Sequence, residues 1–244
     1  MNIEDTNQGI VTDLNGHTRA FIKIQDGCNN ACSYCKVRLV RGASIARPKN
    51  KIIEEATGLL NRGIKEIVVT GICVGLWKGE QNETLPALLK ELCSLDGDYR
   101  IRVSSIEPHH VTKNFIKIIS DFDSSAKHLH IPLQSGSNKI LKAINRIYSA
   151  EDYKQLIANI RKNIPLIGIS TDIIAGFPGE KDEDFKTTKK ILTEICPARL
   201  HVFSFSPREG TPAATMKNRV PGNIIKQRVT ELITLGKIFK KNSL

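Results

Sequence analysis

The sequence has 244 residues, 40% of them hydrophobic, so the chain is long enough to bury one sizeable core. Lys and Arg outnumber Asp and Glu by 36 to 25, and the formal net charge of +11 favours polyanionic partners such as nucleic acid. Residues 1–16 lack the basic flank and apolar run of a secretory signal, and no apolar stretch reaches the length of a membrane span. We therefore expect a cytoplasmic protein with no membrane partner.

Six cysteines raise the question of disulfides. A chain of this length needs no covalent staples, and three of the six crowd into the eight residues from Cys28 to Cys35. Reduced cysteines in the cytoplasm fit this pattern better than a disulfide framework.

Short apolar runs alternate with longer amphipathic stretches, which is the pattern of repeated strand–helix units around a parallel sheet. In chain order we predict a strand at 21–25, a helix at 51–61, a strand at 66–70, a helix at 85–94, a strand at 101–105, a helix at 112–120, a strand at 128–133, helices at 138–144 and 149–163, a strand at 170–175, a helix at 183–195 and a strand at 200–205. Thr84, Ser137 and Ser149 are the predicted helix caps.

A basic helix at 224–241, ending in Lys237, Lys240 and Lys241, closes the chain. Right-handed crossovers would curl six parallel strands into a barrel or leave an open sheet. We predict an α/β fold with a partial (β/α)6 barrel, similar to a TIM barrel, whose functional groups gather at the carboxyl ends of the strands. The predicted organisation is an N-terminal extension at 1–17, a core domain at 18–223 and the basic helix at 224–244.

Cys28, Cys32 and Cys35 form a CxxxCxxC segment directly after the first strand. A structural zinc site normally closes with four protein ligands, and the next cysteine, Cys73, is far along the chain. A 4Fe-4S cluster needs a ligand on each iron, so three thiolates leave one iron open. The alternatives are a zinc site completed by a distant Cys or His, and inert core cysteines.

With Tyr34 before the last cysteine, this segment resembles the signature of the radical-SAM superfamily. The resemblance implies that the open iron chelates the amino and carboxylate groups of S-adenosylmethionine. One electron from the cluster would then cleave the sulfonium to a 5′-deoxyadenosyl radical, while the protein positions the groups and excludes water.

Further segments, spread over residues 18–215, resemble the tRNA methylthiotransferases, most nearly the threonylcarbamoyladenosine type. They are residues 23–28, 41–42, 69–72, 104–108, 133–137, 145–146, 171–180 and 205–212. The resemblance implies methylthiolation at C2 of a modified adenosine beside the anticodon of tRNA. It also implies an electron donor such as flavodoxin or ferredoxin. The second choice is the related enzyme type that acts on isopentenyladenosine.

The same resemblance assigns contacts to S-adenosylmethionine. Thr70 and Gly71 would meet the methionine amino group, Arg146 its carboxylate, Asp172 the ribose hydroxyls and Tyr34 the adenine, with Glu107 and Gln134 as further polar contacts. Arg208 would lie at the mouth where an anionic substrate enters.

Structural alternatives stand beside four of these assignments. Arg146 and Glu107 would pair with each other, Gln134 would cap a helix, and Tyr34 would be a core residue. Residues 177–180 read as a turn that starts a helix, with Glu180 stabilising the positive end of that helix.

Full-length enzymes of this type carry an N-terminal domain with a second cluster and a C-terminal β-barrel that holds tRNA, and we expect both to be absent here. Cys73, Cys93 and Cys196 are too dispersed to rebuild the second cluster site, and Cys73 is expected to be a buried thiol. A partner chain would then carry the second cluster, and this chain alone would make the radical without completing methylthiolation. The alternatives are a diverged radical-SAM enzyme and a non-catalytic basic RNA-binding module.

Overall fold

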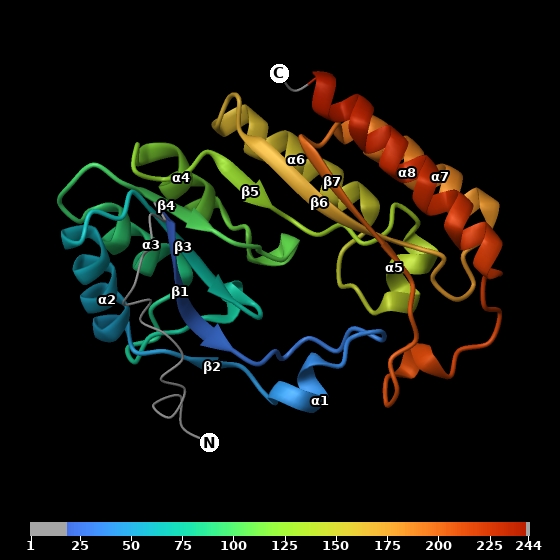
Figure 1. The fold of residues 1–244 in the computed structure, drawn as a ribbon, viewed down its shortest axis with the longest axis horizontal. Helices are drawn as coiled ribbons and strands as arrows, with labels where there is room; N and C mark the ends of the chain where they lie inside the picture. Colours follow the sequence, from blue (N-terminus) through green and yellow to red (C-terminus); the bar gives the residue numbers. More distant parts are fainter. Residues whose placement is uncertain (1–18, 243–244) are drawn as a thin grey trace. The chain divides into compact units, whose positions relative to one another are not determined.

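The structure is a computed structural model that describes residues 19–242 (Figure 1). The N-terminal extension predicted at residues 1–17 lies outside the described residues. The described chain divides into two compact units, one made of residues 19–29, 41–106 and 110–127, and the other of residues 30–40, 107–109 and 128–242. No helix in this part of the chain is long and apolar enough to span a membrane.

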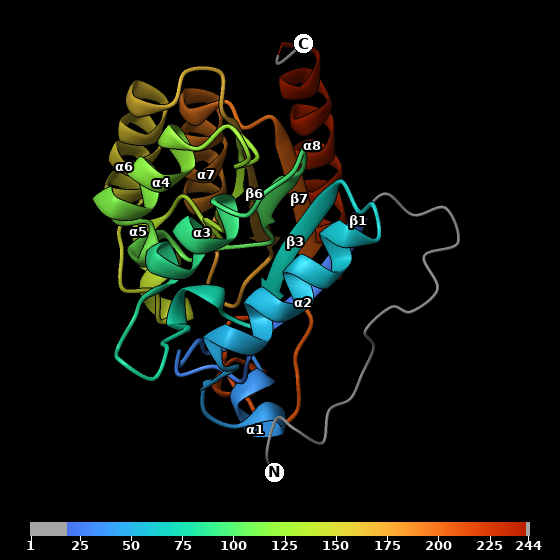
Figure 2. The same cartoon turned by 90° about the vertical axis from the view of Figure 1, so that its left-hand side faces the viewer.

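The first unit contains a four-stranded sheet in the order β2-β1-β3-β4. Strands β1 (Arg19–Asp26), β3 (Glu66–Gly71) and β4 (Arg100–Val103) are parallel, and the two-residue strand β2 (Ile45–Ala46) pairs antiparallel with the end of β1. Helices α2 (Lys49–Asn61), α3 (Leu85–Cys93) and α4 (Lys113–Asp121) belong to this unit, and Figure 2 shows α2 and α3 lying over its strands. The 3-10 turn η2 (Val74–Leu76) follows β3.

Alternating burial along the chain is typical of the β1 strand. Ala20, Ile22 and Ile24 are buried, whereas Phe21 and Lys23 between them are exposed. This pattern turns the side chains of Ala20, Ile22 and Ile24 toward the core of the unit and leaves Phe21 on the exposed face.

The second unit contains a three-stranded parallel sheet in the order β5-β6-β7, formed by β5 (His128–His130), β6 (Gly168–Ala175) and β7 (Arg199–Ser204). Its helices are α5 (Asn138–Ile144), α6 (Ala150–Asn163), α7 (Asp182–Ile195) and α8 (Gly222–Asn242). Helices α6 and α7 pack on each other and α8 packs on β7. The shorter elements are α1 (Val37–Arg41) and the 3-10 turns η3 (Pro108–His110) and η4 (Pro212–Ala214).

The six predicted strands and seven predicted helices are all present, and every one except α5 has at least one shifted end. Strand β5 stops at His130 and not at Leu133, because Pro132 has no N–H to donate and the Leu133 N–H donates to the Thr171 hydroxyl at 3.0 Å instead of to a backbone carbonyl. The elements α1 and β2 were not predicted, since they are too short to show a periodic pattern.

The predicted caps are confirmed in position but only partly in bonding. Ser149 forms a full capping box with Asp152. Thr84 and Ser137 also occupy the N-cap position, yet neither makes a side-chain cap hydrogen bond, and the Ser137 hydroxyl donates to Asp184 at 2.7 Å. The three predicted cap positions are thus confirmed, and only Ser149 also makes the side-chain cap hydrogen bond.

Candidate cofactor site

Cys28 belongs to the first unit, and Cys32 and Cys35 to the second. All three are partly buried, whereas Cys73 and Cys93 are buried, and none of the six cysteines is in a disulfide. The burial expected for Cys73 is thus confirmed, with 6% of its surface exposed. Thiols in partly exposed loop positions are accessible to a metal centre, whereas thiols buried in the core are not.

The entry to the cysteine segment is fixed by Gln25, whose surface is 1% exposed. Its Nε2 donates to the carbonyl oxygens of Asp26 and Gly27, each at 2.7 Å, and to the Ser44 hydroxyl at 2.8 Å. Its Oε1 accepts from the Cys73 N–H at 2.8 Å. One buried amide therefore links the end of β1, the residue before Cys28 and the segment after β3.

Two glycines are required in the same region. Gly27 has φ +69°, and a Cβ there would lie 2.0 Å from the Ala43 carbonyl oxygen. At Gly71 a Cβ would lie 2.8 Å from the Gln25 carbonyl oxygen. The packing of the first unit already demands a glycine at 71, so the contact of Thr70 and Gly71 with a methionine amino group stays a prediction.

In the second unit, the C-terminus of α5 holds the segment around Cys32. The Ser33 N–H donates to the Ile144 carbonyl at 2.9 Å and the Ser33 hydroxyl to the Ala143 carbonyl at 2.8 Å. The Asn145 side chain donates to the Ala31 carbonyl at 2.8 Å, and Asn145 itself is the left-handed C-cap of α5 with φ 67°. The two Ser33 bonds satisfy carbonyls that the end of α5 leaves open, and the Asn145 bond ties the cap residue to Ala31.

Arg146 follows directly, with a side chain that is 4% exposed. Its Nη1 donates to Glu107 at 2.5 Å and its Nη2 to the Tyr34 hydroxyl at 3.3 Å, while the guanidinium carbon lies 5.9 Å from the centre of the Tyr148 ring. Burial alone would lower the pKa of Arg146, but Tyr148 and Glu107 outweigh it and raise the pKa, so the side chain is a permanent cation. The pairing of Arg146 with Glu107 that was considered as an alternative is therefore present. The buried Nε of Arg146 has no hydrogen-bond partner in the described structure.

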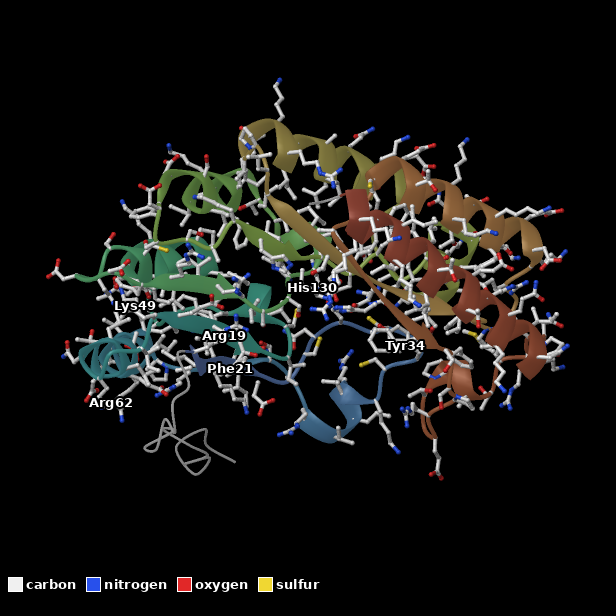
Figure 3. The ribbon with its side chains drawn as sticks, turned by 45° about the horizontal axis from the view of Figure 1, so that its top comes forward. Arg19, Phe21, Tyr34, Lys49, Arg62 and His130 are labelled. Carbon is white, nitrogen blue, oxygen red and sulfur yellow. The ribbon has the colours of Figure 1, made fainter. Side chains whose placement is uncertain are left out.

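Tyr34 directly precedes Cys35 in the cysteine segment and is labelled in Figure 3. Its ring packs against a buried cluster formed by Ile140, Ile144, Ile174, Phe177 and Ala213. Burial raises the pKa of the Tyr34 phenol far above its ordinary value, so the hydroxyl stays neutral. The core role considered for Tyr34 is thus present, and an adenine contact stays a prediction.

Gln134 has left-handed backbone geometry, with φ 71°, and only 6% of its surface is exposed. Its N–H donates to the Asp172 carbonyl at 2.8 Å and its carbonyl accepts from the Ile174 N–H at 2.9 Å. Left-handed geometry is costly for a residue with a side chain, and such strain concentrates at functional positions. Gln134 lies three residues before the N-cap of α5, so the helix-cap alternative is wrong.

Asp172 on β6 binds two histidines that sequence reasoning did not assign to the site. Its Oδ2 lies 3.0 Å from His130 Nε2 and its Oδ1 lies 3.2 Å from His201 Nδ1. The sequence held one signal for such a cluster. His128 and His130 are two residues apart on a predicted strand, so their side chains must face the same side of the sheet.

Glu180 does not stabilise the helix start, and that expectation is wrong. Its carboxylate accepts from the Gly176 N–H at 2.8 Å and from Arg228 at 2.7 Å, and burial raises the pKa of Glu180. The first turn of α7 carries Asp182 and Asp184 instead. Arg208 is exposed in the turn after β7, and its carbonyl accepts from Thr211.

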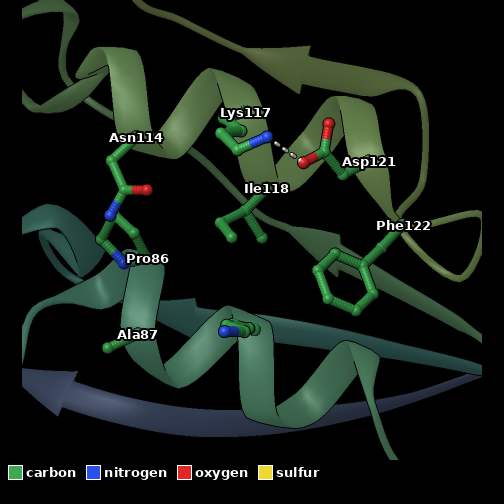
Figure 4. Close-up of a pocket in the computed structure, with 8 residues that line it drawn as sticks. Pro86, Ala87, Asn114, Lys117, Ile118, Asp121 and Phe122 are labelled. Atoms are coloured by element: carbon green, nitrogen blue, oxygen red, sulfur yellow. Dashed lines mark hydrogen bonds and ion pairs between the residues drawn. The ribbon is translucent and has the colours of Figure 1, made fainter.

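A hollow between α3 and α4 is lined by Pro86, Ala87, Lys90, Asn114, Lys117, Ile118, Asp121 and Phe122 (Figure 4). Lys117 and Asp121 in this lining form an ion pair with each other, with Lys117 Nζ 2.6 Å from Asp121 Oδ2. None of the predicted site residues lines this hollow, so it is not the candidate cofactor site.

The model of the Radical SAM superfamily matches residues 22–192. The chain is 39% identical over 228 residues to the threonylcarbamoyladenosine tRNA methylthiotransferase MtaB of Chlamydia pneumoniae, covering 93% of this chain and 54% of that protein. It is also 39% identical over 220 residues to the tRNA-2-methylthio-N(6)-dimethylallyladenosine synthase of Zymomonas mobilis, covering 88% of this chain and 49% of that protein. The chain spans about half the length of these relatives.

Solved structures show the same fold. The radical S-adenosylmethionine methyltransferase TsrM from Kitasatospora setae, with cobalamin and a [4Fe-4S] cluster bound, has a TM-score of 0.67 at 16% identity and covers 80% of this chain and 38% of that chain. Coproporphyrinogen III oxidase (HemN) from Escherichia coli has a TM-score of 0.61 at 17% identity and covers 90% of this chain and 52% of that chain. The α/β radical-SAM barrel fold predicted from the sequence is confirmed by these likenesses.

Members of the matched family are enzymes that use a 4Fe-4S cluster and S-adenosylmethionine. The matched range contains Cys28, Cys32, Cys35, Arg146 and Asp172. The chain belongs to the radical-SAM superfamily, and its sequence relatives are tRNA methylthiotransferases.

Proposed function

We propose that this chain is the radical-generating part of a tRNA methylthiotransferase that acts at C2 of threonylcarbamoyladenosine. The observation that carries the proposal is the CxxxCxxC segment, whose three partly buried cysteines follow β1 at the position where this fold places its chemistry. The net charge of +11 agrees with a tRNA substrate. An electron donor such as flavodoxin or ferredoxin, a partner with a second cluster and a cytoplasmic location belong to the same proposal.

The residues present fit a 4Fe-4S cluster with one open iron. Three thiols within eight residues supply soft ligands, and a fourth cysteine does not occur in the segment to close the set. Bound there, the cluster would supply the electron that cleaves S-adenosylmethionine to methionine and a 5′-deoxyadenosyl radical. Cys28, Cys32 and Cys35 are the proposed ligands.

Arg146 is the proposed partner of the methionine carboxylate. Its cation is buried, Glu107 and Tyr34 hold two of its nitrogens, and Nε retains a donor for a further acceptor. Charge-assisted bonds of this kind are stronger than neutral ones and fix the orientation of a ligand. Glu107 and Tyr34 then orient Arg146, whose side chain is only 4% exposed and so is largely shielded from water.

The remaining proposed contacts are Thr70 and Gly71 with the methionine amino group, Gln134 as a polar contact and Asp172 with the ribose. The strained backbone of Gln134 supports its place among them. Arg208 is proposed to meet the anionic tRNA, since it is exposed in the turn after β7.

The cluster is tested by anaerobic reconstitution of the chain, followed by iron and sulfide assays and visible spectra. Cys32→Ala should lose the cluster, and Cys196→Ala is the matched control because Cys196 is also partly buried but lies outside the segment. With strong reductant, the reconstituted chain should convert S-adenosylmethionine to 5′-deoxyadenosine, and Arg146→Ala should weaken cofactor binding. Full iron content in Cys32→Ala would contradict the proposal.

The nucleoside is tested by mass spectrometry of tRNA from a deletion strain. Loss of the methylthio group from threonylcarbamoyladenosine supports the proposed substrate. Loss from isopentenyladenosine would instead favour the second relative, the tRNA-2-methylthio-N(6)-dimethylallyladenosine synthase. Unchanged methylthio nucleosides would reject both substrates.

A further inference from the structure

Polar side chains line one face of the β5–β6–β7 sheet in the second unit. The hydrogen-bond chain runs from His128 through Ser170 to His130, then through Asp172 to His201, with steps of 3.1, 2.9, 3.0 and 3.2 Å. Strand register produces this line-up, since His201 pairs with Asp172 across β6 and β7, and His130 pairs with Ser170 across β5 and β6. The proposed cofactor role uses only Asp172 of this group.

Three residues of this hydrogen-bonded series come close together. One ligand atom each from His130, Asp172 and His201 lie within 4.8 Å of one another, and all three residues are partly buried. The rings of His130 and His201 are stacked with centroids 5.2 Å apart, and both present a nitrogen to the same carboxylate. Two imidazoles and one carboxylate on adjacent strands form a rigid donor set.

The spacing fits coordination to one ion. In an octahedral site with metal–ligand bonds of about 2.1 Å, neighbouring ligand atoms are about 3.0 Å apart. The His130–Asp172 and Asp172–His201 contacts, at 3.0 and 3.2 Å, match this edge. A cation would enter with small movements of the three side chains.

The second nitrogen of His130 is also placed as in metal sites. His130 Nδ1 lies 2.9 Å from the Ser170 hydroxyl, which leaves Nε2 directed at Asp172. Metal-bound histidines commonly have their other ring nitrogen held by a hydrogen bond that fixes the ring. Ser170 is 2% exposed and therefore holds this ring in place.

We propose that His130, Asp172 and His201 bind one divalent first-row transition ion, separate from the cluster on the cysteines. Two histidines and one carboxylate are typical ligands of mononuclear Fe²⁺, Mn²⁺ and Zn²⁺ sites. Each histidine lies against a different oxygen of Asp172, so one ion can be held by both carboxylate oxygens together with the two ring nitrogens. Three protein ligands leave positions on the ion for water or an oxygen ligand.

The probe for this site is Mn²⁺, which prefers nitrogen and oxygen ligands and so avoids the cysteine thiolates that would compete for Zn²⁺. Titration of the cluster-free chain, followed by the EPR signal of free Mn²⁺, should show one saturable site per chain. Pulsed EPR should show coupling to histidine nitrogen. This readout needs neither the cluster nor S-adenosylmethionine, so its failure is distinguishable from failure of the proposed function.

His201→Ala should lower the Mn²⁺ affinity at least tenfold, and Asp172→Asn should do the same. His109→Ala is the matched control, since His109 is an exposed histidine outside the triad, and it should bind Mn²⁺ like the parent chain. Thermal melting without Mn²⁺ verifies that each variant folds, and added Mn²⁺ should raise the melting temperature of the parent and control only. Lack of saturable binding at millimolar Mn²⁺, or equal affinity in His201→Ala, would overturn the proposal and leave a hydrogen-bonded triad without a metal.

Discussion

Arg228 on α8 donates to the carboxylate of Glu180 at 2.7 Å, and the two side chains are 5% and 2% exposed. The same carboxylate accepts from the Gly176 N–H, and Arg228 also reaches Asp182 at 2.6 Å. The C-terminal helix thus ties down the turn that follows β6. Solvent hardly screens an ion pair with so little exposure.

Arg228→Ala should therefore be strongly destabilising, because it leaves the Glu180 charge buried without its partner. Loss of one member of a buried pair costs about 3–5 kcal/mol. Urea unfolding gives the free energy directly. Lys189→Ala is the matched control. It removes an ion pair from α7 to Glu231 of α8 in which both side chains are 36% exposed, and it should cost about 1 kcal/mol or less. Equal losses in the two variants would contradict the role given to burial.

Gly27→Ala should destabilise the chain far more than Gly42→Ala, although both glycines have left-handed backbones, with φ +69° and +74°. The unfavourable backbone alone costs about 1–2 kcal/mol at either position. Only at Gly27 does the new Cβ collide with a neighbour, the Ala43 carbonyl. The checks are urea unfolding and, after reconstitution, iron content, which should fall in Gly27→Ala because Cys28 is the next residue. Similar stability of the two variants would refute this account.

Gln25→Leu should weaken both stability and cluster retention. The substitution leaves the Gly27 carbonyl and the Cys73 N–H without their buried partner, at about 1–3 kcal/mol for each unsatisfied group. Gln155→Leu, at an exposed position of α6, is the control. Thermal melting and the rate of iron loss to a chelator should separate the variants, and identical iron loss would argue against a positioning role for Gln25.

Acid should remove the stabilising effect of Glu66. A hydrogen bond from Arg102 at 2.8 Å, together with Arg19 nearby, holds the pKa of Glu66 below its ordinary value of 4.5. Its contribution is thus fully present above pH 4.5 and is lost as the pH falls through the lowered folded-state pKa.

At pH 7, Glu66→Gln should therefore cost on the order of 1 kcal/mol relative to the parent chain. At strongly acidic pH the two proteins should converge in free energy of unfolding, because the parent carboxyl is then protonated. Glu54→Gln serves as the control, since the Glu54 side chain is 71% exposed. A cost for Glu66→Gln that stays constant with pH would be evidence against the ion pairs.

The sequence predicted the strands, the helices and the cysteine segment because each depends on local patterns. Alternation in β1, capping at Ser149 and the spacing of Cys28, Cys32 and Cys35 can all be read within a few residues. Where one residue interrupted a pattern the prediction failed, as at Pro132, which ends β5 early.

Partners from distant parts of the chain could not be predicted in this way. Glu180 was expected to serve its neighbouring helix, but its partner Arg228 lies 48 residues away. Gln25 and Cys73 are likewise 48 residues apart. The triad of His130, Asp172 and His201 depends on the register of three strands, which no single stretch of sequence specifies.

The attachment of Ala31 and Ser33 to the end of α5 has a consequence for the protein before any metal arrives. The bonds at Ala143, Ile144 and Asn145 are made to main-chain carbonyls or by the cap residue itself, so the folded end of α5 helps to shape the segment around Cys32. The apoprotein therefore holds this part of its ligand loop preorganised. The cluster would then bind to a loop that is already ordered here, because the entropy cost of ordering this part of the loop arises when the protein folds and not when the metal binds.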